Sequence, residues 1–215
     1  MSKDVLITRP EYDYTTRYIS AWAKKVIDFA KLKGILLFDL LQTRATKKEL
    51  ESILHKKDPR FVVINGHGND ILVCGQDGEV LIEAGVNENI LRSRIVYALS
   101  CRSAKVLGFK SIENGALAYI GYTEDFIFMY SNEKRGHPLD DKTAELFLGP
   151  SNQVVISLLK GHTAGEAQQN SRKSFLRNMQ KLLTSESSLE DSSTLRYLFW
   201  DMQHQVCLGD KAATL

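Results

Sequence analysis

The stretch VVINGHGND, residues 62–70, places a histidine between two glycines directly after a run of apolar, largely β-branched residues. A second stretch, IVYALSCRSA (residues 95–104), repeats this plan, with Cys101 where the first has His67. Apolar runs without alternation are typical of strands buried on both faces of a parallel sheet. If the two strands are neighbours, about 4.8 Å apart, both side chains project over one edge of the sheet, where ligands of such sheets bind.

The rest of the N-terminal part predicts alternating strands and helices. We expect strands over residues 4–9, 35–41, 61–65, 95–100 and 116–122, with helices over 13–33 and 46–57. Two apolar runs around Gln76, Asp77 and Gly78 predict a hairpin. This order predicts an α/β fold, a three-layer sandwich with a mostly parallel central sheet flanked by helices.

After residue 140 the pattern becomes mostly helical. We expect helices over residues 142–148 and 152–160, separated by Gly149 and Pro150, then a helix capped by Thr163 and a last one over 194–206. A serine-rich polar loop over 184–194 precedes the last helix. The simplest organisation is one domain over residues 1–215, with an α/β core (1–140) and a helical C-terminal part (141–215).

The composition is that of an ordinary globular protein, with 43% hydrophobic and 25% charged residues. A net charge of +2 and lysines in scattered pairs argue against direct binding of nucleic acid. The longest near-apolar run, residues 35–41, contains Asp39 and is too short to cross a bilayer. With no signal sequence in view, we expect a cytoplasmic protein without membrane contact.

The cysteine pattern predicts neither disulfides nor a metal site. Three cysteines is an odd number, and no CxxC pair is present. We therefore expect free thiols, no bound metal and no cofactor. Cys74 and Cys207 fit the role of small apolar residues.

Cys101 has a chemical role if His67 lies beside it. A thiolate is the reactive form of cysteine, and an imidazole can take the thiol proton near neutral pH. The backbone amides of Gly68 and Cys101 are natural donors to a developing oxyanion. A helix beginning within residues 103–107 would further lower the thiol pKa, and Arg102 would stabilise the thiolate.

The ordered motifs VVINGHG, a hairpin, YALSCRSA and GALAYIGY resemble the caspase-fold (clan CD) cysteine peptidases, which include caspases, gingipains, separase and the bacterial CHAT proteins. The segment LLKGHTAGEAQQNSRKSF, residues 158–175, is similar to a helical segment of the CHAT and gingipain-like branch. The resemblance implies His67 as general acid and base, Cys101 as nucleophile and the Gly68 amide as oxyanion donor, with no metal and no obligatory third residue. Asn65 or a backbone carbonyl would then orient the imidazole.

The resemblance also implies a specificity pocket beside the cysteine, after the strand at 116–122. Asp125 and Glu124 follow that strand, and Asp70 follows His67 closely. Carboxylates there would pair with arginine or lysine in a protein or peptide substrate, although a solvated acidic loop explains Glu124 and Asp125 equally well. The polar segment 131–141 predicts an exposed loop open to self-cleavage at Lys134 or Arg135.

Two other readings compete with the peptidase. A catalytically silent caspase-fold domain would act as an interaction module, and intact His67 and Cys101 argue against it. A nucleotide-binding or receiver domain would need a GxGxxG or GK[ST] loop or an acidic cluster after the first strand, which the sequence lacks. The family further suggests latency until a regulatory partner or signal acts, and a role in bacterial defence.

Overall fold

The computed structural model describes residues 4–183 and 189–215. The strands are β1 (Val5–Arg9), β2 (Leu37–Leu41), β3 (Phe61–Asn65), β4 (Leu72–Cys74), β5 (Val80–Glu83), β6 (Ile95–Leu99), β7 (Ala118–Tyr122) and β8 (Gln205–Gly209). The α-helices are α1 (Tyr14–Leu32), α2 (Lys47–Lys57), α3 (Leu107–Glu113), α4 (Lys142–Leu159), α5 (Ala164–Leu183) and α6 (Leu189–His204).

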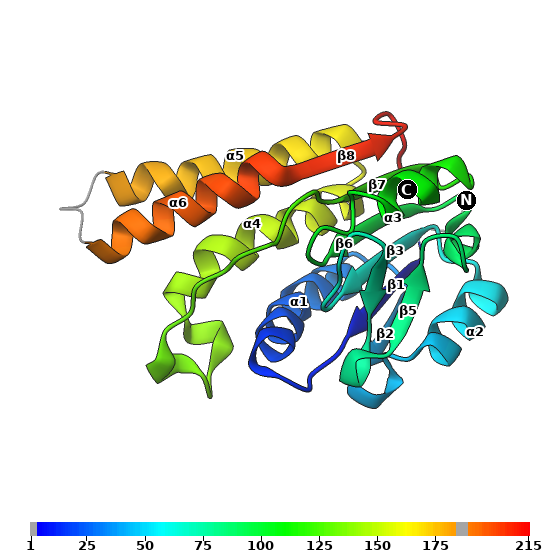
Figure 1. Cartoon of the computed structure of the whole chain (residues 1–215), viewed down its shortest axis with the longest axis horizontal. Helices are drawn as coiled ribbons and strands as arrows, with labels where there is room; N and C mark the ends of the chain where they lie inside the picture. Colours follow the sequence, from blue (N-terminus) through cyan, green and yellow to red (C-terminus); the bar gives the residue numbers. More distant parts are fainter. Residues whose placement is uncertain (1–3, 184–188) are drawn as a thin grey trace.

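Six strands form one sheet in the order β2-β1-β3-β6-β7-β8. All neighbours are parallel except β7 and β8, while β4 and β5 form a separate antiparallel hairpin. Figure 1 shows α5 and α6 side by side, projecting past the sheet, with β8 continuing from α6 into the sheet. The predicted mostly parallel sheet with a small hairpin and C-terminal helices is confirmed.

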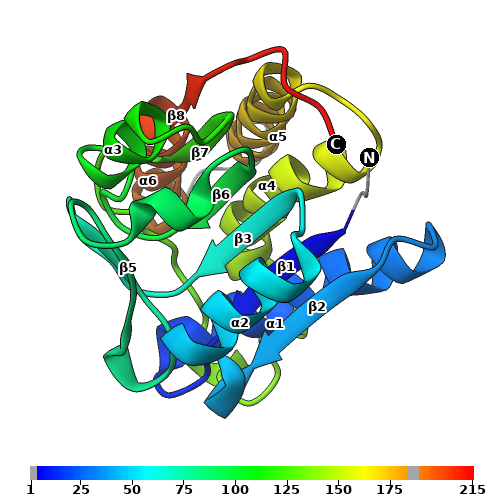
Figure 2. The same ribbon diagram turned by 90° about the vertical axis from the view of Figure 1, so that its right-hand side faces the viewer.

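The two faces of the sheet have separate cores. In β1, Val5 and Ile7 pack with residues of α1, α4 and α5, whereas Leu6 packs with α2, α3 and the hairpin. Figure 2 shows the sheet with α2 in front of it and α4 behind. Alternate residues of each central strand are therefore buried on opposite faces, which is why the apolar runs in the sequence are continuous.

The early elements lie close to their predicted limits. The β3 limits match the prediction, and Thr46 caps α2 by accepting a hydrogen bond from the Glu49 amide at 3.3 Å. The predicted hairpin turns at Gln76–Gly78, where Asp77 has a φ of 55°. Within the described ranges 4–183 and 189–215, no helix is long and apolar enough to cross a membrane.

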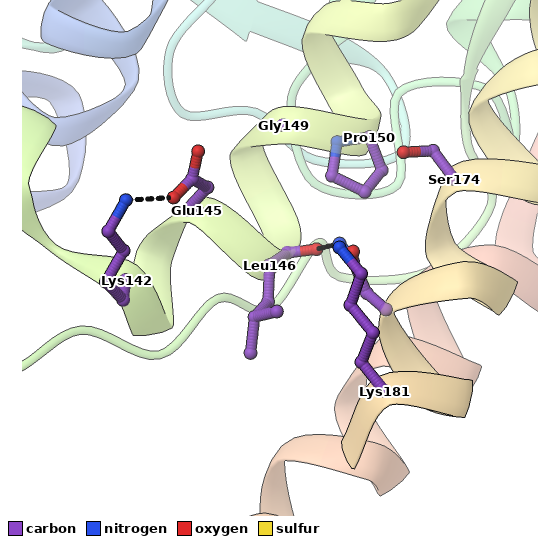
Figure 3. Close-up of a pocket in the computed structure, with 8 residues that line it drawn as sticks. Lys142, Glu145, Leu146, Gly149, Pro150, Ser174 and Lys181 are labelled. Atoms are coloured by element: carbon purple, nitrogen blue, oxygen red, sulfur yellow. Dashed lines mark hydrogen bonds and ion pairs between the residues drawn. The ribbon is translucent and has the colours of Figure 1, made fainter. Parts of the chain in front are cut away.

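The prediction of two helices separated at Pro150 is wrong, because α4 runs through it. Proline lacks the N–H that would bond to the carbonyl four residues earlier, here that of Leu146. Asn178 of α5 donates its side-chain amide to the Leu146 oxygen at 2.8 Å instead, at a cavity that Pro150 and Ser174 also line (Figure 3). A partner far away in the chain therefore satisfies the group that would otherwise end the helix.

The C-terminal prediction also needs correction. The last helix ends at His204, and the next residues form β8, which pairs antiparallel to β7 with Ile120 opposite Cys207. Of the expected serine-rich loop, residues 184–188 lie outside the described residues, and α6 already begins at Leu189. The segment 141–215 thus adds the edge strand β8 to the sheet as well as the helices α4, α5 and α6.

Candidate active site

The carboxyl ends of β3 and β6 bring the two predicted residues to the same edge of the sheet. The strands are parallel neighbours, and Asn65 is paired with Leu99. His67 and Cys101 each follow two residues beyond that pair. Equal offsets on adjacent parallel strands place the imidazole-bearing and thiol-bearing segments side by side.

Close backbone packing holds these two segments together. A Cβ atom built on Gly68 would lie 2.8 Å from the Leu72 oxygen and 3.0 Å from the Ser100 Cβ atom, so only glycine fits. The Ser100 hydroxyl donates to the Gly66 oxygen at 2.8 Å. The glycines therefore serve the packing of the hairpin and of Ser100 against the strand end.

Asp13 is a site residue that the sequence interpretation missed. Its Oδ2 lies 2.6 Å from His67 Nε2, while its Oδ1 accepts the Thr16 amide at 2.7 Å as the N-cap of α1. The carboxylate is fixed by the first turn of a helix that packs one face against the sheet, and its second oxygen contacts the imidazole. This contact occupies Nε2, so Nδ1 is the ring nitrogen left for proton transfer.

The expectation that Asn65 orients the imidazole is wrong. The Asn65 side chain is buried and donates to the Thr8 carbonyl oxygen at 2.9 Å, and the Thr8 hydroxyl lies 3.0 Å from the Asn65 amide. Asn65 therefore ties β3 to β1, and the carboxylate from α1 takes the orienting position.

Asp13 is ionised at neutral pH. Burial acts to raise its pKa, but hydrogen bonds from Thr16 and from His67 outweigh that effect, and the pKa lies below its ordinary value. Tyr12 packs edge-on against the His67 ring at 6.0 Å between centroids. The imidazole is thus held by a charged acceptor and by an aromatic neighbour.

The Cys101 thiol is partly buried and faces the segment after β7. Its Sγ lies 3.9 Å from the Phe126 carbonyl oxygen. Burial is the main cause that raises the pKa of this thiol, and the nearby Asp125 carboxylate adds to the rise. The resting sulfur is therefore a protonated thiol that needs a base to become a nucleophile.

The helix predicted to begin within residues 103–107 is α3, but it begins only at the last of these residues and does not support the thiolate. Residues 101–106 form turns, and α3 begins only at Leu107. The first amide of α3, that of Leu107, donates a hydrogen bond to the Asp70 carbonyl oxygen at 2.9 Å. The positive end of this helix therefore lies beyond the turn that carries Cys101.

Two backbone amides at the site have no hydrogen-bond acceptor among the described residues. The hairpin contact uses hydrogen bonds from Cys74 to the His67 oxygen and from Asn69 to the Leu72 oxygen, one on each side of Gly68. Within the described part of the chain, the amides of Gly68 and Cys101 donate to no acceptor. The two amides predicted to bind an oxyanion thus lie, without an acceptor, on the segments that carry the imidazole and the thiol.

The three acidic residues predicted to bind substrate lie near Cys101, and each is paired with a cation. The Arg102 Nε atom lies 3.3 Å from Asp70 Oδ1 and 3.1 Å from Asp125 Oδ1. Glu124 Oε1 lies 3.6 Å from Lys105 Nζ. Arg102, with a φ of 53°, bridges a carboxylate that follows β3 and one that follows β7. Its charge acts to lower the pKa of the Cys101 thiol, as predicted, but burial outweighs this effect.

A hollow of about 330 Å³ lies beside the Asp13–His67 pair and is lined by Tyr12, Asp13, Tyr14 and Arg17. The Arg135 guanidinium lies over the Tyr14 ring, 4.9 Å from its centroid. The polar segment 131–141 therefore reaches the N-terminal end of α1, next to the site. Across residues 4–183 and 189–215, no cluster of three or more histidine, cysteine and acidic side chains is arranged to hold a metal ion.

Several solved structures resemble this chain, and two of them are of gingipain R. The crystal structure of the Arg-specific cysteine proteinase gingipain R (RgpB) matches with a TM-score of 0.64 and 10% identity, over 100% of this chain and 48% of that chain. The complex of the pro- and mature domains of Porphyromonas gingivalis RgpB matches with a TM-score of 0.63 and 9% identity, over 99% and 48%.

The chain thus spans about half the length of these neighbours. No family profile matches the sequence, and no curated protein does so. At identities near 10% the likeness concerns the fold alone. The mostly parallel sheet flanked by helices is the caspase-like fold of gingipain R.

Proposed function

We propose that this chain is a cysteine endopeptidase in which Cys101 is the nucleophile and His67 the general acid and base. The observation that carries this proposal is the 2.6 Å contact between His67 Nε2 and Asp13. This contact leaves Nδ1 for proton transfer, and Cys101 follows the neighbouring strand at the same edge of the sheet. The caspase-like fold shared with a cysteine proteinase supports it.

The reaction follows from these groups. His67 Nδ1 takes the proton from the Cys101 thiol, and the sulfur attacks the carbonyl carbon of the scissile peptide bond. The carbonyl oxygen becomes an oxyanion that accepts hydrogen bonds from the Gly68 and Cys101 amides. The C–N bond then breaks as the imidazolium protonates the leaving amine.

The second half of the reaction reverses the proton path. Water gives a proton to His67 Nδ1 while its oxygen attacks the thioester carbon, and the C–S bond breaks. The released sulfur takes the proton back. The Asp13 carboxylate stabilises the imidazolium that forms in both halves, because it is ionised at neutral pH.

The substrate is a peptide with arginine or lysine before the cut. The two carboxylates of Asp70 and Asp125 share the single charge of Arg102, so this cluster retains an excess negative charge. That excess favours a cationic side chain over an anionic one. A solved neighbour is named as Arg-specific, which agrees with this preference.

Two features favour a latent resting state. The raised pKa of Cys101 keeps the sulfur protonated at neutral pH, and Arg102 already engages two of the carboxylates that would bind the substrate. A regulatory protein partner would then be needed to rearrange the site. The CHAT-like branch, the cytoplasmic location and the role in bacterial defence stay predictions from the sequence.

The test is hydrolysis of fluorogenic peptides that end in arginine, lysine, aspartate or leucine before the reporter group. We expect turnover of the basic peptides, lost after thiol alkylation and in Cys101→Ala and His67→Ala. Cys207→Ala, a matched change in a strand at the far edge of the sheet, retains it. Turnover that survives Cys101→Ala refutes the mechanism. If the unchanged chain shows no turnover under any activating condition, the alternative of a catalytically silent interaction module is favoured.

A further inference from the structure

The C-terminal helix α6 is bonded to the segment 123–127, which directly follows β7. The indole Nε1 of Trp200 donates to the Asp125 carbonyl oxygen at 3.0 Å. The Asp201 Oδ1 atom accepts a hydrogen bond from the Ile127 amide, also at 3.0 Å. Adjacent residues of the helix therefore hold the backbone of this segment at two points.

A third contact lies at the end of α6. The Thr123 amide donates to the His204 carbonyl oxygen at 2.9 Å, and the Thr123 hydroxyl lies 3.3 Å from His204 Nδ1. Residues 123, 125 and 127 are alternate positions along the segment, so one backbone edge faces the last turn of α6. The helix holds this edge much as a neighbouring strand would.

The other side of the same segment contacts the turn that carries the thiol. The Phe126 carbonyl oxygen lies 3.9 Å from Cys101 Sγ, and the Glu124 carbonyl oxygen accepts the Arg102 amide at 3.1 Å. Asp125 contacts Arg102 through its side chain. The segment 123–127 is thus held between α6 and the Cys101 turn, and its position decides what surrounds the sulfur.

Asp201 accepts the hydrogen bond from the Ile127 amide as a neutral, protonated side chain. It is fully buried, and its Oδ2 atom has no hydrogen-bond partner among the described residues. Burial raises its pKa well above the ordinary value, and among the described residues no cation pairs with it to offset the lost hydration. A neutral carboxyl group accepts the Ile127 amide as an asparagine side chain would.

We propose that Trp200 and Asp201 are positioning residues that hold the segment 123–127 against Cys101. Asp201 fixes the carbonyl beside the sulfur, and Trp200 fixes the backbone of Asp125 and hence the place of its carboxylate. The link to catalysis rests on the proposed peptidase function. The link to the surroundings of the thiol does not depend on that function.

The experiment compares Asp201→Ala, Asp201→Asn and Trp200→Phe with the unchanged chain. Gln203→Ala, an exposed site on the same helix, is the control. The first readout is the rate at which iodoacetamide alkylates Cys101, followed by peptide mass spectrometry. This rate requires no peptidase activity, so it tests the positioning even if the chain hydrolyses nothing.

Release of the segment exposes the sulfur. We expect alkylation of Cys101 in Asp201→Ala to be about fivefold faster, the equivalent of one lost hydrogen bond. Asp201→Asn and Gln203→Ala keep the rate of the unchanged chain. An unchanged rate in a folded Asp201→Ala chain overturns the proposal, and so does a rate in Asp201→Asn as fast as that in Asp201→Ala.

Trp200→Phe removes the N–H donor and keeps a smaller aromatic ring, so it covers the case in which Asp201→Ala does not fold. In the active peptidase we expect KM for arginyl peptides to rise about fivefold, with kcat unchanged, because the Asp125 carboxylate loses its fixed position. Unchanged KM in an active Trp200→Phe enzyme overturns the role given to Trp200. Absence of hydrolysis in the unchanged chain under every activating condition counts against the peptidase instead and leaves alkylation to decide.

Discussion

Asp13 and His67 are 54 residues apart in the chain, yet the Asp13 Oδ2 and His67 Nε2 atoms lie 2.6 Å apart. The carboxylate is the N-cap of α1, and the imidazole follows β3. One residue thus both begins a core helix and orients the proposed base. Because the two roles use different oxygens, they can be separated by substitution.

Asp13→Asn is expected to lower peptide hydrolysis without loosening the helix. Asparagine is as good an N-cap as aspartate, but it cannot stabilise the imidazolium with a negative charge. We expect kcat to fall by about tenfold to a hundredfold, part of the 10²–10⁴ that general acid–base catalysis typically contributes. Steady-state kinetics of the basic fluorogenic peptides measures this loss.

Asp13→Ala is the matched comparison, since it removes the cap as well. Urea denaturation should show a loss of about 1 kcal/mol in unfolding free energy for Asp13→Ala and little change for Asp13→Asn. If Asp13→Asn retains full activity, the carboxylate acts as a cap only and the orienting role is wrong.

The pH dependence of Cys101 alkylation tests whether the thiolate is preformed. Burial raises the pKa of this thiol above its ordinary value of 9.0, so the charged form appears only in alkaline solution. We expect the iodoacetamide rate at Cys101, resolved from Cys74 and Cys207 by peptide mass spectrometry, to keep rising beyond pH 9. A plateau already reached near neutral pH would show instead a thiolate stabilised by its surroundings.

The local sequence predicts the strands and the two residues that follow them, because apolar runs and glycines act over short distances. His67 and Cys101 therefore reach the same edge of the sheet as expected. Asp13 was not found because nothing local to it reports the approach of His67. The only feature of the sequence that could have pointed to Asp13 is its position as an acidic residue at the start of the helix that follows the first strand.

The missed elements have a similar cause. Pro150 ends a helix by local rules, but Asn178 supplies a donor to the free Leu146 oxygen. Val206, the first apolar residue of β8, continues the helical spacing of Leu198 and Met202, and only pairing with the open edge of β7 places it in a strand. In each case a contact between distant parts of the chain overrides the local preference.

Arg102→Gln is expected to increase cleavage after basic residues. The substitution removes the cation that engages Asp70 and Asp125, so both carboxylates become available to an arginine or lysine of the substrate. All three side chains are substantially exposed, and such ion pairs contribute about 1 kcal/mol or less, so the gain in kcat/KM is at most about fivefold. Initial rates with arginyl and leucyl peptides measure it.

Lys105→Gln is the control, because Lys105 pairs with Glu124 outside this cluster. It should change the preference between arginyl and leucyl peptides less than Arg102→Gln does. A fall in arginyl cleavage with Arg102→Gln would mean that Arg102 holds the site together rather than competing with the substrate.

Self-cleavage is expected after Lys134 in preference to Arg135. Both residues are exposed, but the Arg135 guanidinium lies over the rings of Tyr14 and Tyr130, and no such contact holds the Lys134 side chain among the described residues. Trp22 anchors the following turn by donating from its indole Nε1 to the Pro138 oxygen at 2.9 Å. A segment held against α1 in this way is more readily reached by the site of a second copy, so the rate should rise with protein concentration.

Intact mass spectrometry of the incubated chain measures this self-cleavage, with fragments 1–134 and 135–215 as the expected products. Lys134→Ala should suppress the main cut, and Cys101→Ala should abolish it, which separates self-cleavage from a contaminating protease. Adding active chain to Cys101→Ala should restore the cut if one copy cleaves another. A chain that stays intact while it hydrolyses arginyl peptides would show that the contacts of this segment with Tyr14, Tyr130 and Trp22 keep it out of the site.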